Sequence, residues 1–149
     1  MNNQSKDQRF AKLEISSAEI GQDLFIPEAG EVRAGFPSPA SDFVENSIDL
    51  NKYLITHPAA TFFGRVKGFS MINAGISEGD LLIIDRSIEP NNGAIAVCFL
   101  DGEFTLKKIK LEADGCWLLP ENEDFQPIHV TEKSEFIIWG IVIHVIKSF

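Results

Sequence analysis

The chain has 149 residues, which suits one domain with an appendage, because single domains commonly hold about 100–150 residues. Its apolar fraction of 44% and charged fraction of 23% exclude a wholly disordered protein. Thirteen Lys and Arg against 22 Asp and Glu give a net charge of −9, whereas direct binding to nucleic-acid phosphates takes a basic patch. A connection with DNA would therefore run through a protein partner.

The first forty residues predict an arm, not a domain. Residues 1–8 are almost entirely polar, and the apolar residues between Phe10 and Pro27 follow no sustained helical or strand period. Residues 28–39 then bring glycines and prolines close together. Because so short a segment cannot bury a core of its own, we predict an extended, flexible N-terminal arm over residues 1–40 and a folded body over 41–149.

The body shows the pattern of a mainly β protein. Residues 42–50 could form a short helix or helical turn, and compact β-like runs separated by turn signals follow it. The expected strands cover residues 61–67, 81–85, 94–100, 103–111, 117–119 and 136–146. Asp101-Gly102 fits a two-residue hairpin loop between its flanking runs. Many short strands with little helix predict a β-barrel or sandwich.

A serine lies directly after the first of these strands, among small and turn-forming residues. The segment is Gly68-Phe-Ser-Met-Ile-Asn-Ala-Gly-Ile-Ser-Glu-Gly-Asp80. A serine at a strand end can expose its Oγ beside free backbone N–H groups, as an acyl-transfer nucleophile requires. Ser70 is therefore a candidate nucleophile. A plain turn or a helix cap is the alternative interpretation.

Three lysines, Lys107, Lys108 and Lys110, interrupt the strand expected over residues 103–111. A lysine in apolar surroundings loses its stabilising water, so its pKa falls and it can act as a general base for a serine. Strand alternation puts Lys107 and Lys108 on opposite faces but does not choose between them. Solvated lysines on an edge strand that discourage aggregation are the alternative.

Ala34-Gly35 has features of a protease substrate. It precedes Phe36-Pro-Ser-Pro39, in which Pro37 forbids helix and biases Phe36 toward an extended conformation. A protease requires its substrate strand extended, and small residues at the bond fit a narrow site. Taken alone, the segment is a linker.

The other reactive side chains point to no metal and no cofactor. Cys98 lies in an apolar run, where a buried thiol behaves as a small hydrophobe, and Cys116 has no CxxC partner. None of His57, His129 and His144 has a metal-ligand spacing with Cys or another His, and no P-loop or GxGxxG occurs. A Ser-His-Asp triad remains possible, without any local signature to support it.

Nothing in the sequence predicts association with a membrane. The longest apolar stretch, residues 136–143, falls far short of the roughly 20 residues that a membrane helix needs. The chain opens without a charged-then-apolar leader. We therefore expect a cytoplasmic protein.

Several short segments form a specific combination by their order and spacing. They are Ala34-Gly-Phe-Pro-Ser-Pro-Ala40, Ile48-Asp-Leu-Asn51, His57-Pro58, Gly68-Phe-Ser-Met71, Gly75-Ile-Ser-Glu-Gly-Asp-Leu-Leu-Ile83, Asp101-Gly-Glu-Phe-Thr-Leu-Lys-Lys108 and Gly140-Ile-Val-Ile-His-Val145. Together they resemble the self-cleaving LexA/UmuD family of serine peptidases, over roughly residues 33–149. The resemblance implies a LexA/signal-peptidase-like β fold for the body.

The resemblance also implies the site residues. Ser70 matches the nucleophile of the family, Lys107 matches its general base, and the bond between Ala34 and Gly35 falls where the family cuts itself. Backbone N–H groups of Ser70 and Phe69 would stabilise the oxyanion. Phe69 departs from the family, in which an acidic residue commonly precedes the serine, but it removes no catalytic group.

The partners of the family extend these expectations. The resemblance implies a homodimer, a RecA filament on single-stranded DNA that stimulates cleavage, and a UmuC-type Y-family DNA polymerase that joins the processed form for error-prone translesion synthesis in the SOS response. Direct sequence-specific DNA binding is not expected, since the segment before the cut is too short for a full helix-turn-helix domain. The alternatives are a non-proteolytic module that regulates a DNA polymerase or RecA, a signal-peptidase-like enzyme with a membrane anchor, and a stand-alone transcription regulator.

Overall fold

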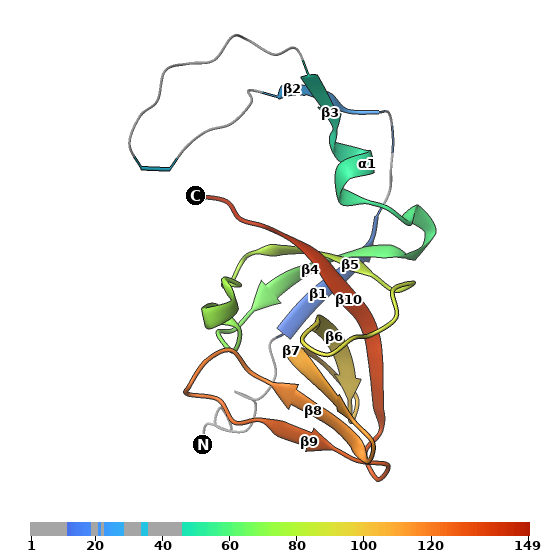
Figure 1. Cartoon of the computed structure of the whole chain (residues 1–149), viewed down its shortest axis with the longest axis vertical. Helices are drawn as coiled ribbons and strands as arrows, with labels where there is room; N and C mark the ends of the chain where they lie inside the picture. Colours follow the sequence, from blue (N-terminus) through green and yellow to red (C-terminus); the bar gives the residue numbers. More distant parts are fainter. Residues whose placement is uncertain (1–11, 19–20, 22, 29–33, 36–45) are drawn as a thin grey trace, which may run out of the picture.

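The computed structural model describes residues 12–18, 21, 23–28, 34–35 and 46–149. An antiparallel sheet of eight strands forms the body, and a two-stranded sheet lies beyond it (Figure 1). The elements in chain order are β1 (Lys12–Ser17), β2 (Phe25–Glu28), β3 (Asn46–Asp49), α1 (Leu50–Leu54), the 3₁₀ turn η1 (Pro58–Ala60), β4 (Thr61–Lys67), the 3₁₀ turn η2 (Ile72–Ala74), β5 (Leu81–Asp85), β6 (Ile95–Leu100), β7 (Glu103–Glu112), β8 (Gly115–Leu119), β9 (Ile128–Val130) and β10 (Phe136–Ile146). The predicted mainly β fold is confirmed.

Strand β10 joins the two halves of the large sheet. The strand order is β1-β4-β5-β10-β6-β7-β8-β9, and β10 pairs with β5 through its C-terminal half and with β6 through its N-terminal half. The register with β6 shifts between Ile138 and Gly140, just before Ile141, which pairs with both neighbouring strands. A Cβ at Gly140 would lie 2.6 Å from Ile84 Cγ2, so the close approach of the two strands there requires glycine.

Two clusters of buried apolar side chains lie on opposite faces of β6 and β7. One cluster includes Val66, Leu82 and Leu106, and the other includes Cys98, Ile109 and Leu118. The expectation that Cys98 is a buried thiol is confirmed, and burial raises the pKa of that thiol to about 12. Strand β7 contributes to both clusters, so its centre crosses the middle of the barrel.

The hairpin predicted at Asp101-Gly102 is present between β6 and β7. Both loop residues have positive φ, 49° at Asp101 and 89° at Gly102, as a type I′ turn requires. The resulting register pairs Leu100 with Glu103 and Ala96 with Lys107. This register fixes which lysine of β7 points into the barrel.

The helix predicted over residues 42–50 is wrong for its described part. Residues 46–49 form β3, which pairs with β2, and the helix α1 begins only at Leu50; residues 42–45 lie outside the described part of the chain. Asp49 explains the later start, because its side chain accepts hydrogen bonds from the N–H groups of Asn51 and Lys52. An N-cap ends the extended strand and starts the helix at the next residue.

The predicted arm contributes a strand to the body. Strand β1 pairs antiparallel with β4 and forms one edge of the eight-stranded sheet. The sequence analysis did not identify β1, β2 or β9, which are short. Among the residues that the structure describes, no helix has both the length and the apolar character needed to cross a membrane.

Candidate active site

Two segments bring Ser70 and Lys107 together inside the barrel. Strand β4 ends at Lys67, and a turn through Gly68, with a φ of 99°, carries Ser70 back toward the core. The central part of β7 supplies Lys107 from the inward face of the sheet. Ser70 is 2% exposed and Lys107 only 1% exposed, so the pair lies almost entirely out of water.

The amine of Lys107 has three neighbours at hydrogen-bond distance. Its Nζ lies 3.0 Å from Ser70 Oγ, 3.1 Å from Thr105 Oγ1 and 3.1 Å from the carbonyl oxygen of Leu106. Within the described part of the chain, no carboxylate forms an ion pair with this amine. A charged ammonium would therefore be buried without a counter-charge.

Burial without a counter-charge favours the neutral amine. Desolvation lowers the pKa of Lys107 to about 8, from its usual 10.5. The neutral amine has two N–H donors and one lone pair. The carbonyl of Leu106 and the hydroxyl of Thr105 can accept the two N–H groups, which leaves the lone pair for the Ser70 hydroxyl. The site can therefore take the proton of Ser70.

The loop after β8 holds the turn that carries Ser70. The N–H of Glu121 donates to the carbonyl of Ser70 at 2.8 Å, and Asn122 Nδ2 donates to the carbonyl of Phe69 at 2.8 Å. In the part of the chain that the structure describes, the N–H groups of Phe69 and Ser70 donate to no acceptor. They remain available to a negatively charged oxygen in front of Ser70.

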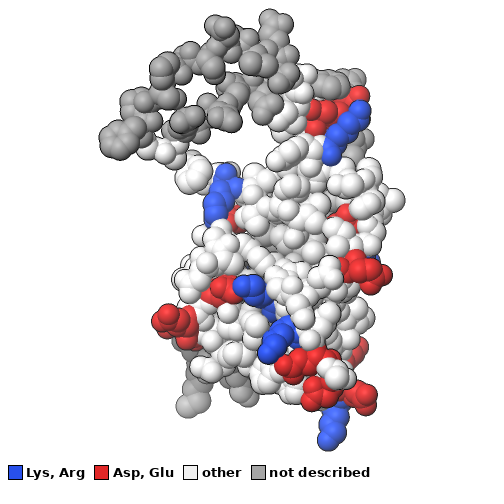
Figure 2. Space-filling model, viewed as in Figure 1, with Lys and Arg blue, Asp and Glu red and all other residues white. Residues whose placement is uncertain are grey.

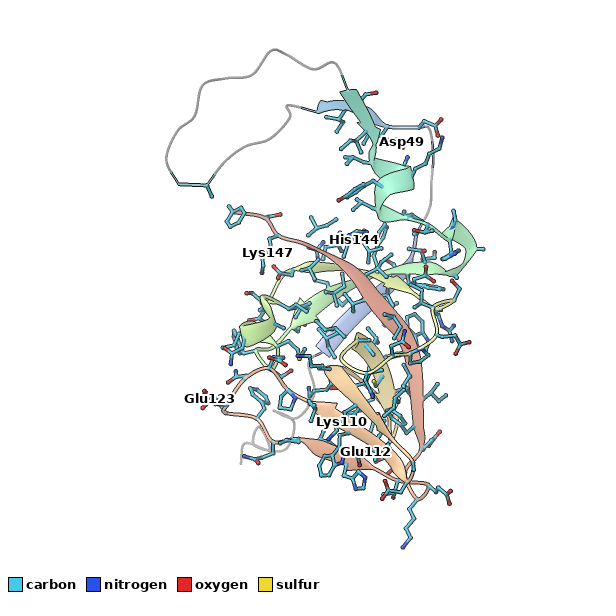
Figure 3. All side chains as sticks on the ribbon, in the orientation of Figure 1. Asp49, Lys110, Glu112, Glu123, His144 and Lys147 are labelled. Atoms are coloured by element: carbon cyan, nitrogen blue, oxygen red, sulfur yellow. The ribbon has the colours of Figure 1, made fainter. Side chains whose placement is uncertain are left out.

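A surface hollow lies beside this turn. It has a volume of about 390 Å³, and Glu123, labelled in Figure 3, belongs to its lining. Phe69 is 56% exposed next to Ser70. An apolar side chain thus stands in solvent directly before Ser70.

The predicted cleavage site lies apart from Ser70. Ala34 and Gly35 are both exposed and belong to the segment between β2 and β3, and Gly35 has a φ of 121°. In Figure 1 the short coloured stretch for residues 34–35 is drawn away from β7 and η2. The structure therefore brings together Ser70, Phe69 and Lys107, and it does not bring Ala34 and Gly35 to them.

The histidines do not complete a Ser-His-Asp triad around Asp85. His57 Nδ1 lies 2.6 Å from Asp85 Oδ2, and the Ser87 hydroxyl donates to the other carboxylate oxygen at 2.6 Å. Ser87 thus contacts the carboxylate and not the imidazole. Burial opposes ionisation of Asp85, but the hydrogen bonds from Ser87 and His57 outweigh it and lower the pKa of the carboxyl.

His129 belongs to an exposed cluster at the far end of β7. The side chains of Glu112, Asp114 and His129 offer ligand atoms that all lie within 4.8 Å of one another. Glu112 already pairs with Lys110 and accepts a hydrogen bond from Trp117; Figure 3 labels Lys110 and Glu112. The predicted absence of a metal stays a prediction.

Three further residues shape the site. Strand alternation in the sequence already puts Thr105 on the face of Lys107, although it assigns Thr105 no role. Glu121 and Asn122 gave no signal, since they lie about 50 residues from the turn that they hold and act largely through backbone groups.

The fold and the site define a class of protein. A serine hydroxyl in contact with a buried lysine amine whose pKa is lowered is an arrangement found in serine hydrolases. The chain belongs to the peptidase S24-like family, whose pattern matches residues 27–143.

Three relatives illustrate the family. The chain is 43% identical to Protein ImpA of Salmonella typhimurium over 128 residues, which cover 85% of this chain and 87% of ImpA. It is 40% identical to Protein MucA of Escherichia coli over 114 residues, which cover 76% of this chain and 77% of MucA. It is also 40% identical to the LexA repressor of Ectopseudomonas mendocina (strain ymp) over 127 residues, which cover 85% of this chain and 62% of the repressor.

Proposed function

We propose that this protein is a self-cleaving serine peptidase in which Ser70 is the nucleophile and Lys107 the general base. The observation that carries the proposal is the 3.0 Å contact between Lys107 Nζ and Ser70 Oγ, in a buried environment where no carboxylate among the described residues pairs with the amine. The cut falls between Ala34 and Gly35, as the resemblance to the LexA/UmuD family implies. Membership of the peptidase S24-like family supports the same chemistry.

The reaction proceeds in two steps. Ser70 Oγ attacks the carbonyl carbon of Ala34 while its proton passes to Lys107 Nζ, and the N–H groups of Ser70 and Phe69 stabilise the oxyanion. The C–N bond to Gly35 then breaks, and Lys107 gives the proton to the leaving amine. A water molecule hydrolyses the ester, which regenerates the Ser70 hydroxyl. The products are residues 1–34 and a fragment of 149 − 34 = 115 residues.

The substrate must first reach the nucleophile. Ala34 and Gly35 are exposed and lie apart from Ser70, so cleavage requires the loop to move onto the site of its own chain or of a dimer partner. The covalent tether gives the loop a high effective concentration, so a slow reaction still suffices. A RecA filament on single-stranded DNA accelerates cleavage by binding the engaged arrangement better than the free one.

The processed form acts through proteins and not through direct contact with DNA. It forms a homodimer and joins a UmuC-type Y-family polymerase in the cytoplasm, as part of the SOS response. Residues 35–149 hold 9 Lys and Arg against 16 Asp and Glu, a net charge of 9 − 16 = −7, which supports this role because phosphate binding needs a concentration of positive charge. On the face drawn in Figure 2, basic and acidic side chains form small separate groups among uncharged ones, and no large basic patch is seen among the described residues.

The experiment follows the chain by intact-mass spectrometry during incubation at pH 7 and pH 10, with and without RecA, ATP and single-stranded DNA. We expect a fragment that begins at Gly35, formed faster at pH 10 and faster with the filament. Ser70→Ala stays whole under every condition. A wild-type chain that also stays whole, while it binds RecA or a polymerase, would identify the non-proteolytic binding module instead.

A further inference from the structure

Strand β1 closes the edge of the sheet that leads to Ser70. It pairs with β4 from Ser17 opposite Phe62 to Lys12 opposite Lys67, three residues before the serine. Its other side lies against β7, the strand that carries Lys107, without a ladder between them (Figure 1). The strand therefore fills the gap between the two strands that supply the site.

Few of the β1 side chains that the structure describes hold the strand against the body. Of the β1 side chains that the structure describes, only Ile15 is half-buried, against the cluster that includes Val66 and Leu106, and the others are exposed. The ion pair of Glu14 with Lys67, at 2.7 Å, joins side chains that are 70% and 48% exposed, so water screens it. The ladder of backbone hydrogen bonds to β4 is the main attachment.

A hollow of about 350 Å³ shows that β1 fills its place incompletely. Glu14, Ile15 and Ser16 line one side of this hollow, and Phe63, Arg65 and Leu81 line the other. A strand with a larger side chain at the position of Ser16 would make contacts that β1 does not. The edge can therefore accept a better-fitting strand.

We infer that β1 is a removable cover and that its loss turns the β4 edge into a docking site for an extended segment of a protein partner. The inference rests on the proposed cleavage, because β1 lies within residues 1–34, which the cut releases. Without β1, the outward backbone groups of β4 have no ladder partner. An unpaired strand edge binds an added strand through main-chain hydrogen bonds.

The residues around the edge define the chemistry of the partner. Lys67 and Arg65 lie on the outer face of β4. On β1, the carboxylate of Glu14 lies opposite Arg65 and pairs with Lys67. On the inner face, Ile15 stands opposite Gly64, where the missing side chain leaves room for a branched apolar residue. The fitting partner segment is extended and carries an acidic residue next to an aliphatic one.

The test uses a synthetic peptide with the sequence of residues 10–18 as the probe. We expect the self-cleaved 35–149 fragment to bind it at least about tenfold more tightly than the uncleaved Ser70→Ala chain, in which the tethered β1 competes at high effective concentration. A scrambled peptide should not bind. In the fragment, the N–H groups of Phe63 and Arg65 should exchange hydrogen quickly and become protected when the peptide is added.

A charge exchange tests the register of the bound strand. Replacing Glu14 by lysine in the peptide should weaken binding severalfold, and Lys67→Glu in the fragment should restore it. If binding is instead indifferent to both changes, the peptide does not lie in the place of β1, and the inference is overturned.

A pair of proline variants in the uncleaved Ser70→Ala chain separates this inference from the proposed cleavage. The N–H of Ala18 donates to the carbonyl of Thr61, so the alternation of an antiparallel ladder points the N–H of Ser16 toward β4 and that of Ser17 away. Ser16→Pro should release β1 and admit the peptide, whereas Ser17→Pro should not.

The outcomes are distinct. If no fragment forms but Ser16→Pro admits the peptide, the proposed cleavage fails and the docking edge stands. If the peptide binds neither the fragment nor the Ser16→Pro chain, the docking edge is overturned. It is also overturned if the N–H groups of Phe63 and Arg65 are already protected from hydrogen exchange in the fragment before the peptide is added.

Discussion

Lys107 and Lys108 are adjacent in the chain, but the side chain of Lys107 is buried and that of Lys108 is partly exposed. Lys107 points into the barrel, 1% exposed, with its amine 3.0 Å from Ser70 Oγ. Lys108 points outward and forms an ion pair with Glu121 at 2.8 Å, with 39% of its side chain exposed. The pleat of β7 produces this contrast, because successive side chains of a strand leave on opposite faces.

The contrast supplies a matched pair of variants. Lys107→Ala removes the base and should slow self-cleavage by about 100-fold or more, the usual contribution of a positioned general base. Lys108→Ala removes an equal charge from the surface and should leave the rate within about twofold, since an exposed ion pair contributes little. The measurement is the amount of fragment over time by mass spectrometry. Equal rates for the two variants would show that Lys107 is not the base.

The rate of self-cleavage should follow the neutral form of Lys107. With a pKa of about 8, the neutral fraction is about one tenth at pH 7 and nearly complete at pH 10. We therefore expect the rate to rise about tenfold between these values and to level off above about pH 9. A rate that is flat from pH 7 to pH 10, measured on a chain shown by circular dichroism to stay folded, would contradict this mechanism.

The free energy of unfolding should also depend on pH through the lowered pKa of Lys107. The folded pKa of Lys107, about 8, lies below its usual 10.5, so the unfolded chain binds more protons between these values and stability rises with pH across this window. Below about pH 8 the buried amine costs about 3 kcal/mol, and Lys107→Met removes that cost. The variant should be more stable than the wild type in urea unfolding at pH 7, and the difference should shrink toward pH 10. Parallel curves for the two proteins would contradict a depressed pKa.

Much of the fold could be predicted from local patterns. The runs over residues 61–67, 81–85 and 136–146 coincide with β4, β5 and β10, because each is rich in β-branched, aromatic or aliphatic residues and is bounded by turn signals. Strand β1 escaped prediction because it depends on β4, which is distant in sequence, and β9 because it has only three residues. The strand propensity of a short segment gives no information about a distant partner strand.

The site could be predicted only in part. The turn around Ser70 and the lysines of β7 were visible, but alternation alone left Lys107 and Lys108 equivalent. Both faces of β7 meet buried clusters, through Leu106 on one face and Ile109 on the other, so the choice depends on which face Ser70 approaches. The contact between Ser70 and Lys107 joins residues 37 positions apart, so local periodicity cannot show it.

Thr105 should act as a positioning residue for the base. Its Oγ1 lies 3.1 Å from Lys107 Nζ, and Thr105→Val keeps the shape of the side chain while it removes this hydrogen-bond partner. The charged amine loses more from this change than the neutral one, so the midpoint of the pH–rate profile should move to lower pH. The plateau rate should fall by about tenfold, because the lone pair is no longer aimed at Ser70. Thr105→Ser should restore both values; an unchanged midpoint in the valine variant would show that Thr105 only fills space.

Asp85 should matter for stability and not for cleavage. Its carboxylate is fully buried and accepts hydrogen bonds from the N–H and hydroxyl of Ser87, while His57 contacts its other oxygen. Asp85→Asn removes the charge that these groups are arranged around and should lower the free energy of unfolding by about 2–4 kcal/mol at pH 7. Asp124→Asn, at an exposed position, should change the free energy of unfolding by less than about 0.5 kcal/mol.

Because the pKa of Asp85 is lowered, the contribution of its carboxylate to stability is complete above the usual carboxyl pKa of 3.8 and disappears as the pH falls through the lower folded value. Urea unfolding at pH 7 and in acid measures both effects, and an Asp85→Asn chain as stable as the wild type would show that the charge is not needed.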